Sequence, residues 1–373
     1  MENENSICFI SRIKELIPIN NADKIEQCIC DGWSSVVQKG IHKVDNLVLC
    51  ITNDAIIPEE LAIKWGVISY LRKGNRVRTI KLKGVYSECI LIPIEYCNEK
   101  YFEGEDLEDE FGIYKYEPPA KLIAIPGSNK KVKFQDNREF RVYYKFPNCK
   151  NVPDMFTEND DVVVTRKYHG TNFRCGIVPK IKLTFIERVK KFFGVKINSH
   201  YFTYGSHNVN IGDRNKYTGW YGEDIYQKIS KQYGLEDRMW NIFKSTGSNS
   251  VELYGEIIGK GIQGQYDYGM SAQVLRIFDL QFDGNYMSAD MFFNREITFL
   301  EGIFKVDVLY QGKWDNNLQR FNKETWSNGK QDFPVEGIVV KDRYFTGKEL
   351  KAYKMINPEY LIFSEKHNIE DGH

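Results

Sequence analysis

The stretch that decides the fold covers residues 161–172 and reads DVVVTRKYHGTN. Three consecutive valines are typical of a buried strand, and the glycine after the charged residues allows a sharp turn. The pattern predicts that Lys167 stands at the end of a strand, at the mouth of a sheet, with His169 and Asn172 close by. A surface lysine before an ordinary turn has the same local pattern, so the interpretation depends on the rest of the chain.

A second predicted strand covers residues 251–258 and reads VELYGEII. Alternation places Glu252, Tyr254 and Glu256 on one face, while the apolar residues face the core. Two carboxylates on one face of a strand can simply be solvent-exposed side chains without a role in binding or catalysis. Gly255 and Gly259 nevertheless indicate that something approaches this backbone closely.

Three more strands are predicted downstream, over residues 275–280, 335–341 and 350–355. The first carries Phe278, whose ring belongs in a core by default. The second is apolar apart from its ends, so Glu336 must be paired or lie at the rim of a cleft. A turn near Gly347 separates the last two strands, and the hairpin predicted from this spacing brings Lys354 near Glu336.

The first 118 residues read as short strands separated by turns. Five strands are predicted there, over residues 8–13, 34–38, 46–52, 77–82 and 88–92. This pattern suits a small closed β-barrel, and the OB-fold is a common nucleic-acid-binding version of such a barrel. Pro118 and Pro119 interrupt any strand or helix, so the predicted boundary separates residues 1–118 from residues 119–373.

The second part of the chain mixes strands with two predicted helices, over residues 224–233 and 238–244. At 373 residues, the chain is long enough for two domains with separate cores. The predicted fold class is therefore α+β, with a small OB-like β-barrel followed by antiparallel sheets and flanking helices.

Charge is balanced over the whole chain, with 51 basic and 51 acidic residues. That balance is mild evidence against a nucleic-acid-binding protein unless the charges are segregated. They are segregated locally, because residues 72–83 contain no acidic residue and six basic ones: Arg72, Lys73, Arg76, Arg78, Lys81 and Lys83. We interpret this basic run as a nucleic-acid-binding face of the barrel. A solvated strand edge that discourages aggregation is the alternative.

Composition argues against several classes of protein. No apolar run approaches the roughly 18 residues of a membrane span, and the first residues, MENEN, do not resemble a signal peptide. None of the eight cysteines forms a CxxC pair, which argues against a structural zinc site. We expect a soluble intracellular protein without a membrane partner.

The order and the amino-acid sequences of these motifs resemble those of the covalent nucleotidyltransferase superfamily of ligases and capping enzymes. In chain order, the matching segments are Lys167 to Asn172 (motif I), ELYGE ending at Glu256 (motif III), Phe278-Asp279 (motif IIIa), Glu336-Gly337 with Lys341 (motif IV), and Lys354 (motif V). The HGTN sequence in motif I is similar to that of RNA ligases, whereas DNA ligases and capping enzymes more often carry Asp-Gly in place of His-Gly. With its N-terminal barrel, the chain resembles ATP-dependent RNA ligases that have an OB domain before the adenylyltransferase domain.

The resemblance implies an RNA ligase that uses ATP and Mg²⁺ or Mn²⁺ and acts on RNA at nicks in a duplex; we expect it to be a monomer. It implies four catalytic residues: Lys167, Glu256, Glu336 and Lys354. Nucleotide contacts are implied for His169, Asn172, Phe278, Glu252 and Lys351. A metal ion is expected at Glu256 and Glu336, largely through water. In the expected chemistry, AMP passes from ATP to Lys167 and then to an RNA 5′-phosphate, and a 3′-hydroxyl displaces it.

Four positions differ from the residues that are usual in the family. Ala352 stands where motif V often has a lysine, Arg166 stands where glutamate commonly precedes the nucleophile, and His169 stands where other members carry aspartate. His207 stands where motif Ia usually has an arginine, for which Arg214 is a candidate substitute. Two alternatives therefore stay open: a nucleic-acid-binding pseudoenzyme, and a DNA ligase or capping-type nucleotidyltransferase.

Overall fold

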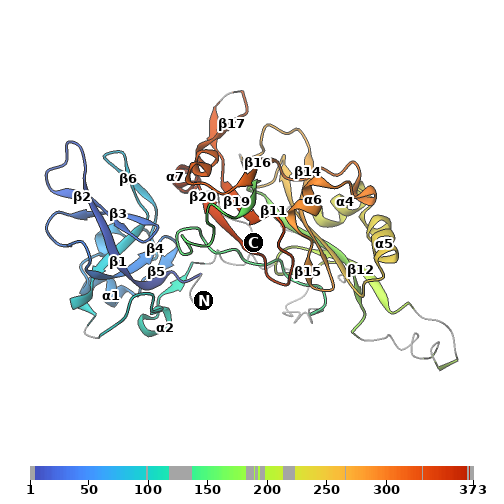
Figure 1. Ribbon diagram of the computed structural model, residues 1–373, viewed down its shortest axis with the longest axis horizontal. Helices are drawn as coiled ribbons and strands as arrows, with labels where there is room; N and C mark the ends of the chain where they lie inside the picture. Colours follow the sequence, from blue (N-terminus) through green and yellow to red (C-terminus); the bar gives the residue numbers. More distant parts are fainter. Residues whose placement is uncertain are drawn as a thin grey trace. The chain divides into compact units, whose positions relative to one another are not determined.

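The computed structural model of the protein describes residues 5–97, 100–116, 137–181, 189, 192–193, 198–212, 223–264, 266–329, 331–367 and 369. The chain divides into two compact units, whose elements are drawn in Figure 1. The first unit consists of Met1–Glu117, Phe146–Glu158 and Ala352–Asn368, and the second of Pro118–Lys145, Asn159–Lys351 and Ile369–His373. Two segments beyond residue 119 therefore belong with the first unit. The predicted boundary residues 118 and 119, and Arg214, lie outside the described residues.

The first unit is built on a five-stranded antiparallel sheet in the order β3-β2-β1-β4-β8. Its strands are β1 (Cys8–Pro18), β2 (Ile25–Cys30), β3 (Trp33–Gln38), β4 (Leu47–Thr52) and β8 (Cys89–Pro93). The two edge strands approach each other, since Ser35 Oγ donates to Cys89 O at 2.8 Å and Glu88 N donates to Ser34 O at 2.8 Å. These bonds nearly close the sheet, which confirms the predicted OB-like barrel.

Shorter elements complete the first unit. They are β5 (Ala55–Ile56), α1 (Glu59–Lys64), β6 (Ile80–Leu82), β7 (Val85–Ser87), α2 (Glu108–Phe111), β9 (Tyr114–Lys115), β20 (Ala352–Ile356) and α7 (Pro358–Lys366). The strand predicted over residues 77–82 was too long, because β6 begins only at Ile80. The placement of the basic run on one strand pair was therefore wrong. Gly74 and Asn75 both have positive φ angles, and the turn that they make interrupts the run.

The larger sheet of the second unit has five antiparallel strands in the order β12-β11-β13-β14-β15. They are β11 (Thr171–Pro179), β12 (His200–Gly205), β13 (Val251–Gly259), β14 (Gln273–Phe282) and β15 (Asn285–Tyr286). Helices α4 (Ile225–Gln232), α5 (Leu235–Thr246) and α6 (Ala289–Asn294) lie beside these strands (Figure 1). Their apolar residues join Leu253, Ile257 and Leu275 in one core, so the helices cover a single face of the sheet.

A second sheet of this unit contains the three consecutive valines and Lys167. Strand β10 (Asp161–Lys167) lies between β16 (Val308–Lys313) and β19 (Gly337–Asp342), antiparallel to both. The three valines of β10 are fully buried, and Lys167 is the last residue of the strand, as predicted. A short hairpin of β17 (Thr325–Ser327) and β18 (Asp332–Pro334) precedes β19. The α+β class with antiparallel sheets is therefore confirmed.

All eight cysteines carry free thiols, and seven of them are buried. Buried thiols pack as small apolar side chains. In the part of the chain that the structure describes, no helix has the length and apolar character needed to cross a membrane.

Candidate active site

Lys167 ends β10 beside the first residue of β19, because the ladder pairs Lys167 with Gly337. Glu336 comes just before β19, and Lys167 Nζ donates a hydrogen bond to Glu336 Oε1. The Glu336 side chain is 5% exposed, whereas the Lys167 side chain is 30% exposed. Among the described residues, Glu336 Oε2 is buried and has no hydrogen-bond partner. A partly exposed amine therefore stands next to a buried carboxylate that has an unused oxygen.

The loop from Lys167 to β11 is held closely against β13. A Cβ atom on Gly170 would lie 2.4 Å from Ile257 O and 2.8 Å from Glu256 Cγ, so only glycine fits at this position. The backbone N of His169 donates to the hydroxyl of Tyr268 at 2.6 Å, and the His169 side chain is buried. The glycine after the lysine thus serves the close approach of two strands in addition to the turn.

Asn172, Glu256 and Arg276 form a row across three neighbouring strands. The register pairs Asn172 of β11 with Glu256 of β13, and Glu256 with Arg276 of β14. Directly opposed residues of antiparallel strands point to the same face, and here it is the face that the helices leave open. Asn172 and Glu256 were predicted from the sequence. Arg276 was not, because alternation within one strand does not reveal which residue of the next strand lies opposite.

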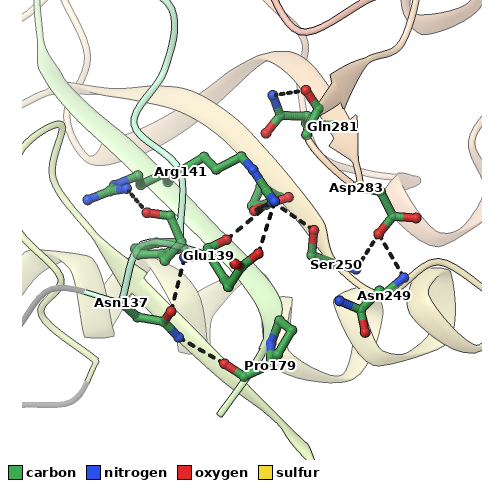
Figure 2. A network of polar contacts seen from close by, with 12 residues as sticks. Asn137, Glu139, Arg141, Pro179, Asn249, Ser250, Gln281 and Asp283 are labelled. Atoms are coloured by element: carbon green, nitrogen blue, oxygen red, sulfur yellow. Dashed lines mark hydrogen bonds and ion pairs between the residues drawn. The ribbon is translucent and has the colours of Figure 1, made fainter. Parts of the chain in front are cut away.

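Arg141 binds a second carboxylate at the other end of this face. Glu252 is fully buried there, and Arg141 Nη1 donates to Glu252 Oε1 at 2.9 Å. The same guanidinium donates to Ser250 Oγ at 2.9 Å and to Glu139 Oε2 at 3.0 Å (Figure 2). Burial raises the pKa of Glu252 to about 7, and the charge of Arg141 opposes this rise. Residues 137–141 therefore cover this end of the face.

Further hydrogen bonds anchor that covering segment. Asn137 Nδ2 donates to Pro179 O at 2.9 Å, and Ser250, which accepts from Arg141, is itself held by a bond from its backbone N to Asp283 Oδ1 at 2.7 Å (Figure 2). Glu252 lies four residues before Glu256 on β13, so the two are about 13 Å apart along the strand. The contact of Glu252 with a nucleotide stays a prediction. The contact of Arg141 with Glu252 could not be predicted from the sequence, because nothing in the local pattern around Arg141 links it to β13.

Phe278 lies in a β-bulge of β14. The register of the β13–β14 ladder shifts between Tyr254 and Gly255 and skips Phe278. Bulges take a residue out of regular alternation and redirect its side chain. The half-buried Phe278 ring has its centroid 4.8 Å from that of Tyr143. The predicted stacking of Phe278 on adenine is a contact that this geometry allows and that stays to be tested.

A buried ion pair supports this bulge. Lys341 Nζ lies 2.5 Å from Asp279 Oδ2 and also donates to Phe278 O at 3.2 Å. The Tyr143 hydroxyl donates to the same Asp279 oxygen. Burial raises the pKa of Asp279, while the adjacent Lys341 ammonium opposes the rise. Lys341, which belongs with Glu336 in the predicted motif IV, therefore links β19 to the bulge that carries Phe278.

The two remaining predicted lysines have other contacts. Lys351 Nζ lies 2.5 Å from Asp160 Oδ1, and the residue comes just before β20. Lys354 lies on β20 in the first unit, where its backbone N donates to Pro147 O at 2.9 Å. The approach of Lys354 to Glu336, and nucleotide contacts for both lysines, stay predictions.

The basic run is partly neutralised within the first unit. Ion pairs join Arg72 to Glu365 at 3.1 Å, Arg76 to Asp54, and Lys81 to Glu359 at 2.5 Å. Arg78 is half-buried, and burial lowers its pKa. Lys73 and Lys83 are exposed, and no ion pair is found for either among the described residues. The predicted contact with nucleic acid would therefore depend mainly on Lys73 and Lys83.

Comparisons with known proteins cover both units. A family model described as RNA ligase matches residues 160–356, and a model of an OB-fold domain matches residues 7–94. None of the curated proteins matches the chain.

Solved structures of an RNA ligase from Naegleria gruberi are similar to the whole chain. A variant solved with ATP and Mn has 20% sequence identity and a TM-score of 0.70, with 98% of this chain and 100% of that chain covered. A variant with AMP and Mn has 20% identity, a TM-score of 0.71 and the same coverage. The ligase with PPi has 19% identity and a TM-score of 0.69, again covering 98% and 100% of the two chains. At this identity, the likeness concerns the fold.

Proposed function

The chain belongs to the RNA ligase family, and from this premise we propose that it is an ATP-dependent RNA ligase that joins a 3′-hydroxyl to a 5′-phosphate at nicks in duplex RNA. The observation that carries the proposal is the Lys167–Glu336 pair at the end of β10, inside the segment that matches the family model. A lysine at this place in the family's pattern suits covalent transfer of a nucleotide. We further propose that the protein works as a monomer inside a cell, where its thiols stay reduced.

The proposed reaction has three transfers. Lys167 Nζ attacks the α-phosphorus of ATP, an N–P bond forms, and pyrophosphate leaves. The 5′-phosphate of the RNA then attacks the same phosphorus, which releases the lysine and leaves AMP on the RNA end. Finally the 3′-hydroxyl attacks the RNA 5′-phosphate, and AMP leaves as the phosphodiester forms.

The first transfer requires Lys167 as a neutral amine. An ordinary lysine side chain has a pKa of ~10.4, so its neutral form costs about 4.6 kcal/mol at pH 7. Glu336 Oε1 holds the amine in position at the end of β10. A positive charge near the amine, such as a metal ion or Lys354, would favour its neutral form. Lys354 is proposed to bind the α-phosphate, whose negative charge is present in all three transfers.

A divalent cation fits the carboxylates at this site. Glu336 Oε2 is a buried acceptor without a hydrogen-bond partner among the described residues, and the Glu256 side chain lies on the open face of the sheet. Within the same residues, no three or more His, Cys, Asp and Glu side chains form a ready metal site. Mg²⁺ is commonly held by one or two carboxylates together with water and phosphate oxygens. When bound, Mg²⁺ or Mn²⁺ would neutralise charge on the phosphates.

The predicted nucleotide contacts have unequal support. Asn172 lies in the row with Glu256, His169 is in the loop after the nucleophile, and Phe278 lies in a bulge of the same sheet. Glu252 and Lys351 instead have protein partners, namely Arg141 and Asp160. We therefore propose the first three as the primary contacts with AMP. The Naegleria gruberi structures with ATP or AMP and Mn support ATP as the substrate and a divalent cation as the cofactor.

The decisive experiment is incubation of the full chain with ATP labelled at the α-phosphate and with Mg²⁺ or Mn²⁺. We expect a labelled protein adduct that is labile to acid and stable to alkali, as a lysine N–P bond is. Added nicked duplex RNA should then remove the label and be sealed. Absence of an adduct would favour the nucleic-acid-binding pseudoenzyme. An adduct from GTP, or sealing of DNA nicks alone, would favour a capping-type enzyme or a DNA ligase.

The proposed RNA contact of the first unit is tested in the full chain. Removing residues 1–117 is unsuitable, since residues 146–158 and 352–368 pack with them. The double variant Lys73→Glu and Lys83→Glu should bind nicked RNA more weakly and with a flatter salt dependence. Each lost phosphate contact reduces the salt slope by about 1. A salt slope equal to that of the wild type would show that Lys73 and Lys83 of the basic run do not contact the RNA.

A further inference from the structure

Arg276 lies between two aromatic rings beside the proposed active site. Its guanidinium carbon is 5.8 Å from the ring centroid of Tyr168 and 5.1 Å from that of Phe304. Tyr168 directly follows Lys167 in the chain, and Arg276 is directly opposite Glu256 in the sheet. The three residues are therefore neighbours beside the nucleophile, and we call them the Tyr168–Arg276–Phe304 platform.

The guanidinium of Arg276 has unused donors. Among the described residues, its Nη1 donates to Lys305 O at 3.4 Å and lies 3.9 Å from Asp307 Oδ1, and both contacts are long. Its Nε is buried and has no hydrogen-bond partner there. By contrast, Arg174 on the same face donates to Ser206 O at 2.8 Å and to Phe140 O at 2.6 Å. The Arg276 side chain is 20% exposed, so the part of the guanidinium beyond the buried Nε is open to a further acceptor such as a phosphate oxygen.

Phe304 is held in place although its side chain is exposed. Its residue is 63% exposed, yet its carbonyl accepts from Ile277 N at 3.0 Å, and Val306 N donates to Ile277 O at 2.9 Å. The segment 304–306 thus runs along β14, which fixes the backbone of Phe304 next to Arg276. The hydroxyl of Tyr168 donates to Asp307 Oδ2 at 2.6 Å and fixes the other ring. Aromatic rings beside a guanidinium plane are typical stacking surfaces for unpaired bases of RNA.

We propose that the Tyr168–Arg276–Phe304 platform binds a nucleotide of the RNA substrate next to the junction that is sealed. The base stacks on Phe304, and a backbone phosphate accepts hydrogen bonds from Arg276. This inference rests on the proposed ligase function and adds to it a binding site for the RNA. A free nucleotide offers the same base and phosphate chemistry as RNA, so the experiment needs one arm for each source.

The test uses the full chain and the variants Phe304→Ala and Phe304→Tyr. Loss of one stacked base is worth about 1–3 kcal/mol, so Phe304→Ala should raise the KM for nicked RNA that is already adenylylated by about tenfold. Phe304→Tyr keeps the ring and should retain a KM near that of the wild type. The KM for ATP in adduct formation should stay within about twofold in both variants, because the site serves RNA. A raised KM for ATP instead would assign the ring to the free nucleotide and overturn the proposal.

Tyr344→Ala is the matched control. Tyr344 is also exposed and lies 5.2 Å from a guanidinium, that of Arg343, but it follows the opposite end of β19 from Glu336. This variant should seal like the wild type. An unchanged KM for RNA in Phe304→Ala, or an equal rise in Phe304→Ala and Tyr344→Ala, would overturn the proposal.

A binding assay separates failure of the platform from failure of the ligase function. Nicked RNA with 2-aminopurine at the bases that flank the nick reports stacking as quenched fluorescence, whether or not the protein forms an adduct. Wild type and Phe304→Tyr should quench one of these bases, and Phe304→Ala should not. Quenching by a protein that forms no adduct would support the platform and refute the ligase. No quenching by an adduct-forming wild type would refute the platform alone.

Discussion

The second unit contains two ion pairs in which a buried carboxylate binds a partly exposed cation. The two pairs are similarly buried and differ in the cation, which is a lysine in one and an arginine in the other. Glu336 is bound by Lys167, and Glu252 is bound by Arg141; the two carboxylate side chains are 5% and 0% exposed, and the two cations 30% and 31%. In each carboxylate, one oxygen accepts from the cation, and the other has no hydrogen-bond partner among the described residues. Burial and pairing of a carboxylate therefore do not by themselves mark a reactive site.

The chemistry of the cation separates the pairs. A lysine can lose its proton and attack phosphorus, whereas a guanidinium stays protonated and holds several acceptors in a fixed fork. Arg141 uses that fork to join Glu252 to Ser250 and Glu139. We therefore propose that the Lys167–Glu336 pair takes part in the reaction and that the Arg141–Glu252 pair holds residues 137–141 on the sheet. Four substitutions test this contrast.

The largest effect is expected from Lys167→Arg. Arginine keeps the positive charge and the ion pair with Glu336 but cannot act as the nucleophile. We expect no labelled AMP on the protein, with an unchanged melting temperature, and continued sealing of RNA that is already adenylylated. Lys313→Arg, which alters an exposed ion pair with Asp161 at 2.8 Å, is the control and should form the adduct normally. Any labelled AMP retained by Lys167→Arg would show that Lys167 is not the nucleophile.

Glu336→Gln should have the next largest effect. The amide keeps the shape of the side chain and removes the charge that holds Lys167 and that would orient a metal ion. We expect adduct formation to slow by a hundredfold to a thousandfold, equivalent to about 3–4 kcal/mol of barrier, while the fold persists. Glu324→Gln removes a carboxylate from an ion pair with Arg166 and serves as the control. Equal rates for both variants would make Glu336 a structural residue like Glu252.

Glu252→Gln should change the pH dependence of stability and leave the reaction nearly unchanged. Burial raises the pKa of Glu252 from 4.5 to about 7, so the folded protein binds this proton more tightly than the unfolded chain. The stabilisation from this group is complete below pH 4.5 and is lost as the pH rises through 7. The loss amounts to at most roughly 3 kcal/mol.

Urea unfolding between pH 4.5 and 8 measures this effect. The wild type should lose stability over that range relative to Glu252→Gln, and Glu139→Gln should behave like the wild type. Parallel pH profiles for the wild type and Glu252→Gln would contradict the raised pKa. A raised KM for ATP in Glu252→Gln would restore the nucleotide contact that the family resemblance implied.

Arg141→Lys should have the smallest effect, and it is the reverse of the first substitution. Lysine keeps a charge for Glu252 but cannot make all the bonds of the fork to Ser250 and Glu139. A typical hydrogen bond contributes about 1 kcal/mol, so we expect a loss of that order in unfolding free energy and unchanged adduct formation. If Arg141→Lys abolished the adduct, the second pair would also belong to the reaction, and the contrast would fail.

The parts of this protein that could be predicted from sequence depend on neighbours within a few residues. The three valines of β10 predict a buried strand, Gly170 predicts the turn, and the motif wording around Lys167 places the chain in its family. Hydrophobic alternation and turn chemistry act locally, so they can be read without knowing the rest of the fold. The barrel of the first unit could be predicted for the same reason.

Partners far apart in the chain could not be predicted. Arg141 and Glu252 are 111 positions apart, and Lys81 and Glu359 are 278 apart. Which side chains meet at such separations depends on strand register and on how segments pack, and neither is encoded in a local pattern. The basic run thus had the appearance of an open face, although three of its six charges have acidic partners.

The sequence by itself determined the order of the motifs along the chain, the lysine at the end of β10 and the glycine that follows it. Only the tertiary structure decided that Glu336 binds this lysine, that Arg276 stands opposite Glu256, and that Glu252 is enclosed by Arg141. The physical reason is that a charged side chain is stabilised or left unpaired by atoms from other strands. Its role is therefore set when those strands come into register.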